Sequence, residues 1–487
     1  MIVVKNKLKT NIIYNILYQI LLVILPFITA PYISRVLGSE GIGIYSYNYT
    51  IACYFGLFIM LGISNHGNRS ISLLKDYDDK KKLGKIFANI YAIQIFMSFI
   101  VIFAYLVYAF LIVKEEQIIS LICILVVLSY SFDITWVYFG LEKFKTTVLK
   151  NVIIKILTVI SIFVFVKNKE DIWIYTLIMS ISLLIANLWL FIPLRKYISF
   201  ALPSFKECIQ NIKPILVLFI PVIAYSIYKL MDKIMLGAMT TMQEVGYYEN
   251  AEKIINIPIG VVTAFSTVMM PYISRMISRG ENNNVEHCNK LSFKYFSIII
   301  FAISFGLIGI SDLFVPIYFG TEFIKCKILI AGLSISVIFI TWANITRTQY
   351  LIPNKRDKVY VISTIVGAIT NLILNLILIP IWGSFGAVVG TIGAEASVFI
   401  TQYIFVRRVF NISRYLKPIL YIFPISLLMS LLVYGFGKIM SATITTLLLQ
   451  VLIGGIFYVL CILLILFITK DEILYNFVYR KRGGKYD

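Results

Sequence analysis

Apolar runs of roughly twenty residues follow one another along the chain, and short polar segments separate them. A helix of about 20 residues can cross the hydrocarbon core of a bilayer, where every backbone polar group needs a partner within the helix. The pattern therefore predicts an all-α integral membrane protein with about fourteen transmembrane helices. The expected spans are 11–36, 43–65, 85–112, 118–140, 148–166, 172–194, 214–237, 246–272, 292–315, 328–350, 359–379, 384–407, 418–437 and 443–468.

The amino-acid composition also favours a membrane protein. Hydrophobic residues make up 60% of the 487 residues and charged residues 14%, against about 45–50% and about 25% in soluble domains. The net charge of +20 would suit nucleic acid, but Lys and Arg lie mainly in the connections between apolar runs, where membrane topology accounts for them. We therefore expect membrane lipids, and no nucleic acid, as partners.

The distribution of basic residues predicts the orientation of the chain. With both termini in the cytoplasm, about 34 of the 44 Lys and Arg residues fall in cytoplasmic segments, including the clusters at 5–9, 69–85 and 480–482. The first apolar run is too long for a signal peptide, and no soluble stretch follows it. Because the richness in Ile, Lys and Asn is typical of an AT-rich bacterial genome, we expect a multi-pass protein of the bacterial inner (cytoplasmic) membrane.

Motifs for catalysis or metal binding are missing from the sequence. The two histidines, His66 and His287, are far apart in predicted loops, and the six cysteines are scattered without a close pair. Neither a zinc-protease motif nor a Gly-rich nucleotide-binding motif occurs. We expect neither an enzyme nor an ATPase, and neither a metal nor another cofactor.

A short motif occurs twice, six predicted helices apart. The copies are residues 36–45 (VLGSEGIGIY) and 235–248 (MLGAMTTMQEVGYY). Each has Leu-Gly near its start, continues through a loop with one glutamate (Glu40 or Glu244), and ends with a glycine that is followed within two residues by tyrosine. Both copies follow a span that starts in the cytoplasm, and parallel repeats of this kind build two lobes around a midplane cavity. We predict an N-terminal lobe at 1–200, a C-terminal lobe at 201–417, and two further helices with a basic cytoplasmic tail at 418–487.

Ionisable side chains inside predicted spans are candidate functional residues, because a charge at bilayer depth costs several kcal/mol unless it faces a cavity or a partner. Lys229 and Lys253 lie roughly 10–12 Å from the outer ends of their helices, so adjacent helices can present both to one cavity. Arg35, near the outer end of the first span, would add to a cationic site for an anion such as a diphosphate. The seventh and eighth spans hold most of these side chains: Lys229, Asp232, Lys233, Glu249, Glu252 and Lys253.

A purely structural interpretation stays open for the same residues. Lys229 with Asp232, and Glu249 with Lys253, are spaced to neutralise one another within the bundle. The outermost basic side chains, such as Arg35, can instead extend to the membrane interface. We therefore treat Arg35, Lys229, Lys233 and Lys253 as candidate substrate-binding residues.

Carboxylates inside the predicted spans are candidates for binding a coupling ion. Asp133 lies in the fourth span and Glu395 near the middle of the twelfth, and each is either an ion site or a buried structural group. Arg347, Arg407 and Arg408 fall at cytoplasmic ends, where they anchor the topology. The full set of candidate carboxylates is Asp133, Asp232, Glu249, Glu252 and Glu395.

Three segments carry a resemblance to a known family. They are PYISRVLG at 31–38 with GIY at 43–45, DITW at 133–136 followed by GLEKF at 140–144, and DKIMLG at 232–237 followed by GYY at 246–248. In this order they resemble the bacterial polysaccharide-biosynthesis flippases, the Wzx-type oligosaccharide transporters. These belong to the MOP exporter superfamily, together with the MATE drug exporters and the lipid II flippases.

The resemblance implies a MATE-like bundle of two six-helix lobes plus two C-terminal helices, opening alternately to each side of the membrane. It implies a flippase that moves an undecaprenyl-diphosphate-linked oligosaccharide repeat unit to the outer leaflet for a capsule, O-antigen or cell-wall polysaccharide. An H⁺ or Na⁺ gradient or the membrane potential would drive it, and the polymerase of the same pathway would be a partner.

Other functions fit the residues less well. A cation-coupled drug exporter should line its cavity with acidic and aromatic side chains, so Lys229 and Lys253 count against it. A membrane polymerase or glycosyltransferase would place its chemistry on a large outer loop, which the sequence does not provide. A peptidoglycan-precursor flippase remains an open variant of the flippase interpretation.

Overall fold

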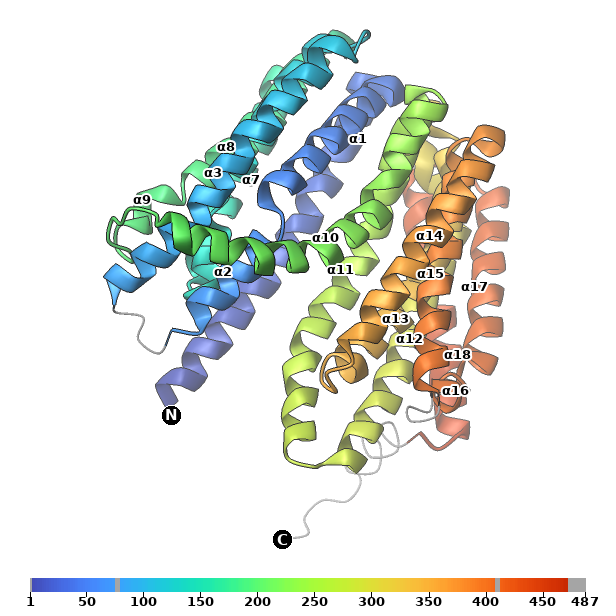
Figure 1. Ribbon diagram of the computed structural model, residues 1–487. Helices are drawn as coiled ribbons and strands as arrows, with labels where there is room; N and C mark the ends of the chain where they lie inside the picture. Colours follow the sequence, from blue (N-terminus) through green and yellow to red (C-terminus); the bar gives the residue numbers. More distant parts are fainter. Residues whose placement is uncertain (1, 75–78, 408–411, 472–487) are drawn as a thin grey trace. The chain divides into compact units, whose positions relative to one another are not determined.

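A computed structural model describes residues 2–74, 79–407 and 412–471, with the backbone alone for residues 2–24, 144, 227 and 228. All regular elements in these ranges are helices, as the length of the apolar runs predicted (Figure 1). They are α1 (Ile2–Met60), α2 (Ile63–Ser72), α3 (Lys80–Leu111), α4 (Gln117–Ile122), α5 (Ile124–Ser131), α6 (Thr135–Gly140), α7 (Phe144–Phe165), α8 (Ile172–Leu188), α9 (Phe191–Leu194), α10 (Phe205–Met239), α11 (Met242–Ser278), α12 (Asn282–Tyr318), α13 (Cys326–Thr346), α14 (Asp357–Trp382), α15 (Ser384–Val406), α16 (Ile412–Tyr415), α17 (Ile419–Ile439) and α18 (Ile444–Ile468).

The helices confirm a multi-pass membrane protein. Within the described residues twelve helical segments are long and apolar enough to cross a bilayer, and the bent pair Leu25–Met60 and Ile63–Ser72 makes up to 13. The first two expected spans, 11–36 and 43–65, both fall largely within α1. Helix α1 breaks at Gly38, whose φ of 69° and ψ of −178° lie in a region that essentially only glycine occupies.

Other spans depart from straight α-helices. The expected span 118–140 is divided into α4, α5 and α6, and the break before α6 follows Asp133. The Asp133 carboxylate accepts hydrogen bonds from the Thr135 backbone N–H (2.9 Å) and hydroxyl (2.6 Å), which satisfies a donor freed by the break. After α13 a π-helix covers Arg347–Leu351. Helix α10 contains Pro214 and Pro221, and Figure 1 shows that it changes direction along its length.

The chain forms two compact units. The first contains residues 1–256 and 364–394, and the second contains 257–363 and 395–487. In the first unit α1 packs against α3 and α7, which lie beside it in Figure 1. A hydrophobic core that includes residues of α1 and α3 surrounds the fully buried Trp136 and Tyr138 of α6. The expected lobes at 1–200 and 201–417 stay a prediction, and the basic tail at 480–482 lies outside the described residues, as does Arg408.

The second unit is held together by α12, which packs against α13, α17 and α18. Near the end of α18 the Asp471 carboxylate accepts a hydrogen bond from the Tyr295 hydroxyl (2.6 Å) and forms an ion pair with Lys294. The Asp471 side chain is only 4% exposed. This buried pair fixes the end of α18 against α12.

Replacing Asp471 with asparagine should therefore destabilise the second unit. Removing one partner of a buried ion pair costs about 3–5 kcal/mol, since the other charge stays buried and unpaired. We expect the apparent melting temperature in detergent to fall by about 5 °C or more. Asp357→Asn is the matched control, because Asp357 is exposed at the start of α14; equal melting of the two variants would contradict the assignment.

Candidate functional site

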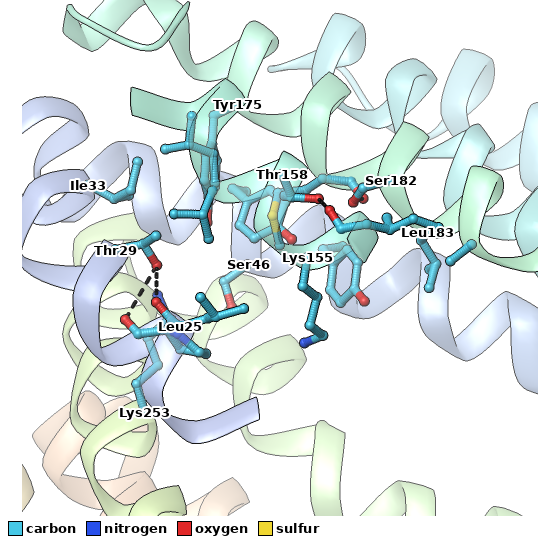
Figure 2. A pocket seen from close by; sticks show the side chains of 18 of the residues that line it. Leu25, Thr29, Ile33, Ser46, Lys155, Thr158, Tyr175, Ser182, Leu183 and Lys253 are labelled. Carbon is cyan, nitrogen blue, oxygen red and sulfur yellow. Dashed lines mark hydrogen bonds between the residues drawn. The ribbon is translucent and has the colours of Figure 1, made fainter. Parts of the chain in front are cut away.

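A cavity of about 570 Å³, lined by apolar, polar and charged residues, lies within the first unit. Its walls come from α1, α6, α7, α8, α10 and α11, and Figure 2 shows side chains that line it. Such a volume is typical of pockets that hold small ligands. The polar and charged lining residues are Thr29, Tyr45, Ser46, Tyr49, Thr50, Thr135, Lys150, Asn151, Lys155, Thr158, Tyr175, Ser182, Asn187, Lys233, Glu249 and Lys253.

One side of the cavity carries a charge network between α10 and α11. The ammonium nitrogen of Lys233 lies 2.6 Å from a Glu249 oxygen and 2.7 Å from a Glu252 oxygen. Lys253 lies 3.5 Å from the other Glu249 oxygen, and the Ser46 hydroxyl of α1 donates to Glu249 at 2.8 Å. Two lysines and two glutamates balance here, so this network contributes no net charge to the cavity.

Helix α7 contributes two lysines to the cavity lining. Lys150 is 2% exposed, and its ammonium group donates to the Ala186 carbonyl oxygen at 2.8 Å. Lys155 projects from the same helix, and Figure 2 shows its nitrogen extending away from the labelled polar groups. Among the described residues no carboxylate forms an ion pair with either lysine. Outside the network between α10 and α11, the positively charged residues of the lining are therefore Lys150, on which the Asp133 carboxylate acts electrostatically, and Lys155.

Two predicted binding residues lie elsewhere. Lys229 is half-buried on α10 and does not line the cavity, and no ion pair joins it to Asp232 in the part of the chain that is described. Arg35 is exposed on α1 and also lies outside the lining. Of the four lysine and arginine candidates, the structure thus brings Lys233 and Lys253 together.

Asp232 points to a different set of partners, although it precedes Lys233 in the sequence. Its carboxylate accepts hydrogen bonds from the Tyr248 hydroxyl (2.6 Å), the Asn375 amide (2.5 Å) and the Thr391 hydroxyl (2.9 Å). These groups belong to α11, α14 and α15, within the first unit. The side chain is 5% exposed, so the cluster forms a buried polar site around one carboxylate.

Comparison with known proteins identifies the family. Residues 8–277 match the family model described as polysaccharide biosynthesis protein. The chain belongs to the polysaccharide biosynthesis protein family. Two family relatives named putative O-antigen transporters are 24% identical over 404 residues (Shigella dysenteriae; 80% of this chain, 98% of the relative) and 25% identical over 409 residues (Escherichia coli; 83% and 98%).

The fold of this family member is also that of a solved flippase. The lipid II flippase MurJ, in an inward closed conformation, matches with a TM-score of 0.75 and 17% identity, covering 96% of this chain and 98% of the flippase. The likeness confirms the predicted fold class, and the family match confirms the resemblance in the quoted motifs.

The remaining predicted carboxylates of this family member have separate environments. Asp133 is half-buried at the break before α6, where Thr135 binds it and also lines the cavity. Glu395 is buried in the part of α15 that belongs to the second unit, and no described side chain forms an ion pair or hydrogen bond with it. Arg347 opens the π-helix and lies 5.4 Å from the ring centre of Tyr360.

Sequence reasoning missed Lys150 and Lys155, because a lysine near the start of a span is normally a topology signal. A stripe of polar side chains on α7 was the available clue. Asn151, Lys155 and Thr158 follow one another at spacings of four and three, which places them on one helix face.

Proposed function

We propose that this protein is a flippase for an undecaprenyl-diphosphate-linked oligosaccharide repeat unit, which it moves from the cytoplasmic to the outer leaflet for export of a surface polysaccharide. The observation that carries the proposal is the pair of lysines on α7, Lys150 and Lys155, that face a membrane-embedded cavity and form no ion pair with a carboxylate of the described residues. The names of the relatives from Shigella dysenteriae and Escherichia coli support it.

The energetics of the cavity favour an anionic ligand. An ammonium group at bilayer depth is costly unless a partner or water compensates it, so unpaired lysines in a cavity suit a ligand that brings negative charge. A diphosphate supplies at least two charges and several acceptor oxygens for the three N–H donors of each lysine. Hydroxyl and amide side chains around them, such as Thr158, Ser182 and Asn187, suit the hydroxyl groups of sugars.

The size of the cavity favours a single repeat unit over a polymer. About 570 Å³ accommodates a diphosphate with its first sugars, while the polyprenyl tail stays in the lipid. We accordingly place the protein before polymerisation, in the inner membrane of a bacterium with both termini in the cytoplasm. The polymerase of the same pathway would then be a partner on the outer side.

A transmembrane H⁺ or Na⁺ gradient, or the membrane potential, is proposed as the driving force, with Asp232 as the candidate ion-binding group. Asp232→Asn should keep the hydrogen-bonded cluster but remove its ability to take up a cation or proton. We expect flipping down a substrate gradient to persist and its stimulation by an imposed ion gradient to be lost. Rates with and without the gradient test this, with Glu40→Gln on the exposed surface as control; stimulation that survives in Asp232→Asn would contradict it.

The proposed function is tested by transport in sealed proteoliposomes. A fluorescent undecaprenyl-diphosphate oligosaccharide is incorporated into the outer leaflet, and the fraction protected from a membrane-impermeant quencher is followed with time. Protection that develops only in vesicles containing the protein supports a flippase. No protection under any ion gradient, together with gradient-driven efflux of a cationic drug, would instead assign a drug exporter.

A further inference from the structure

The first part of α10 leaves an apolar face exposed. Phe205, Ile209, Ile212, Leu216 and Ile220 recur at spacings of three and four, which places them on one side of the helix. Their exposed fractions are 41–82%. Among the twelve helical segments of the described chain that are long and apolar enough to cross a bilayer, the segment that begins at Phe205 is the least buried. These side chains therefore need a covering that the described residues do not supply.

The opposite side of this part of α10 is docked on α2 and α3, and Figure 1 shows it crossing the direction of α3 instead of running along it. The Asn89 side-chain amide of α3 donates to the Glu207 carboxylate at 2.5 Å, and the His66 ring of α2 lies 2.6 Å from the Asn211 side-chain oxygen. One turn after Asn211, Ile215 is fully buried. Glu207, Asn211 and Ile215 follow one another at spacings of four, so they form one stripe along the helix. These contacts fix the rotation of the helix about its own axis and turn the apolar face outward.

Two lysines border the exposed apolar face. Lys206 and Lys213 are seven residues apart, and at about 100° per residue both lie at one edge of that face. Both are exposed, and the side chain of neither forms an ion pair within the described residues. A shallow groove of about 370 Å³ runs along this part of α10, lined by Ile209, Ile212, Lys213, Leu216, Val217 and Ile220. The groove is thus apolar apart from one lysine.

The segment that leads into α10 extends this surface. Phe200 and Leu202 are 93% and 78% exposed. The Ser199 backbone N–H donates to the Lys80 carbonyl oxygen at 3.0 Å, which holds the segment beside the start of α3. Further exposed basic residues of these two segments are Lys81, Lys85, Arg195 and Lys196. This is the end of the unit that the distribution of basic residues predicts to face the cytoplasm.

We propose that this surface, formed by Phe205–Ile220 of α10 with Phe200 and Leu202, binds anionic phospholipids at the membrane interface. A helix with an apolar face bordered by lysines lies in the plane of the interface, with its apolar side chains among the acyl chains. Lysines close to the membrane surface attract negative headgroups. Acyl chains therefore cover the groove, and headgroup phosphates lie against Lys206 and Lys213. This binding does not depend on what the protein transports.

Fluorescence quenching by brominated lipids tests the proposal. In the full chain with its native cysteines replaced, a bimane fluorophore on Ile212→Cys reports contact with bromine atoms on the acyl chains of surrounding lipid. Brominated phosphatidylglycerol should quench it at least about twofold more strongly than brominated phosphatidylcholine at the same mole fraction, since the lysines enrich anionic lipid there. Phe103→Cys is the matched control, because Phe103 is 70% exposed on α3, which carries no basic residue after Lys85; both lipids should quench it equally.

Lysine variants test the cause of the preference. Lys206→Gln with Lys213→Gln should make the two brominated lipids quench equally at position 212. Lys114→Gln with Lys169→Gln, in the connections that follow α3 and α7, should leave the preference unchanged. Equal quenching by both lipids with all lysines present, or a preference that survives the loss of Lys206 and Lys213, would overturn the proposal. Quenching by neither lipid would also overturn it and would assign the apolar face to a protein partner.

Discussion

Replacing Lys155 with alanine should slow flipping of a diphosphate-linked oligosaccharide by about tenfold to a hundredfold. A hydrogen bond to a charged group contributes about 1.5–3 kcal/mol, and each 1.4 kcal/mol is a factor of ten. Lys155 faces the cavity and has no ion-pair partner among the described residues, so its loss removes charge from the cavity without breaking a salt bridge. Initial rates in proteoliposomes, corrected for the amount of reconstituted protein, measure the effect.

Two further variants separate charge from packing at this position. Lys155→Arg keeps the charge and should retain most of the activity. Lys229→Ala removes a half-buried lysine that does not line the cavity, so its rate should stay within about twofold of the wild type. If Lys229→Ala lost activity while Lys155→Ala kept it, the cationic site would lie on α10 as the sequence alone suggested.

Glu249→Gln should cause the second large effect, a loss of stability. The carboxylate lies between Lys233 and Lys253 and also accepts from Ser46, so its neutralisation leaves two lysines with Glu252 alone. Breaking such a buried network costs about 3–5 kcal/mol. We expect the apparent melting temperature to fall by about 5 °C or more, measured as loss of the monodisperse peak after heating in detergent.

The control for this variant is the same change at an exposed site. Glu40→Gln alters one glutamate of the first repeat copy on the surface of α1 and should leave melting unchanged within about 1 °C. An unaltered melting temperature in Glu249→Gln would mean that the network between α10 and α11 does not hold these helices together.

Much of the fold could be predicted because apolar run length reports directly on membrane spans. The division of α1 was among the predictable features, because Gly38, where the helix breaks, lies between the expected spans 11–36 and 43–65. The division of the expected span 118–140 into α4, α5 and α6 could not be predicted, because the residues that accommodate its break, Asp133 and Thr135, look like ordinary polar residues in a helix.

The candidate site was predictable where its contacts are local in sequence. Glu249 and Lys253 are four apart on one helix, and the short connection between α10 and α11 brings Lys233 to them. Contacts between segments that are distant in the sequence could not be predicted. Asp232 binds Asn375 and Thr391, more than 140 residues away, and the fit of Lys150 beside Ala186 depends on the packing of α7 against α8.

The repeated motif predicted two corresponding halves of the chain, and its two copies also contact each other. Its two copies, at 36–45 and 235–248, predicted corresponding positions in two halves, but only the structure shows Gly43 and Gly246 in mutual contact. A glycine that recurs at equivalent places in a repeat can thus indicate a contact between the repeats.

The central claim is that unpaired positive charge in the cavity selects the diphosphate of the cargo. The most direct test compares flipping of two polyprenyl lipids that carry the same oligosaccharide, one through a diphosphate and one through an uncharged linker. We expect the wild-type protein to flip the diphosphate lipid at least tenfold faster and the Lys150→Ala, Lys155→Ala double variant to flip both at similar, low rates. Equal rates for the two lipids with the wild-type protein would contradict the account.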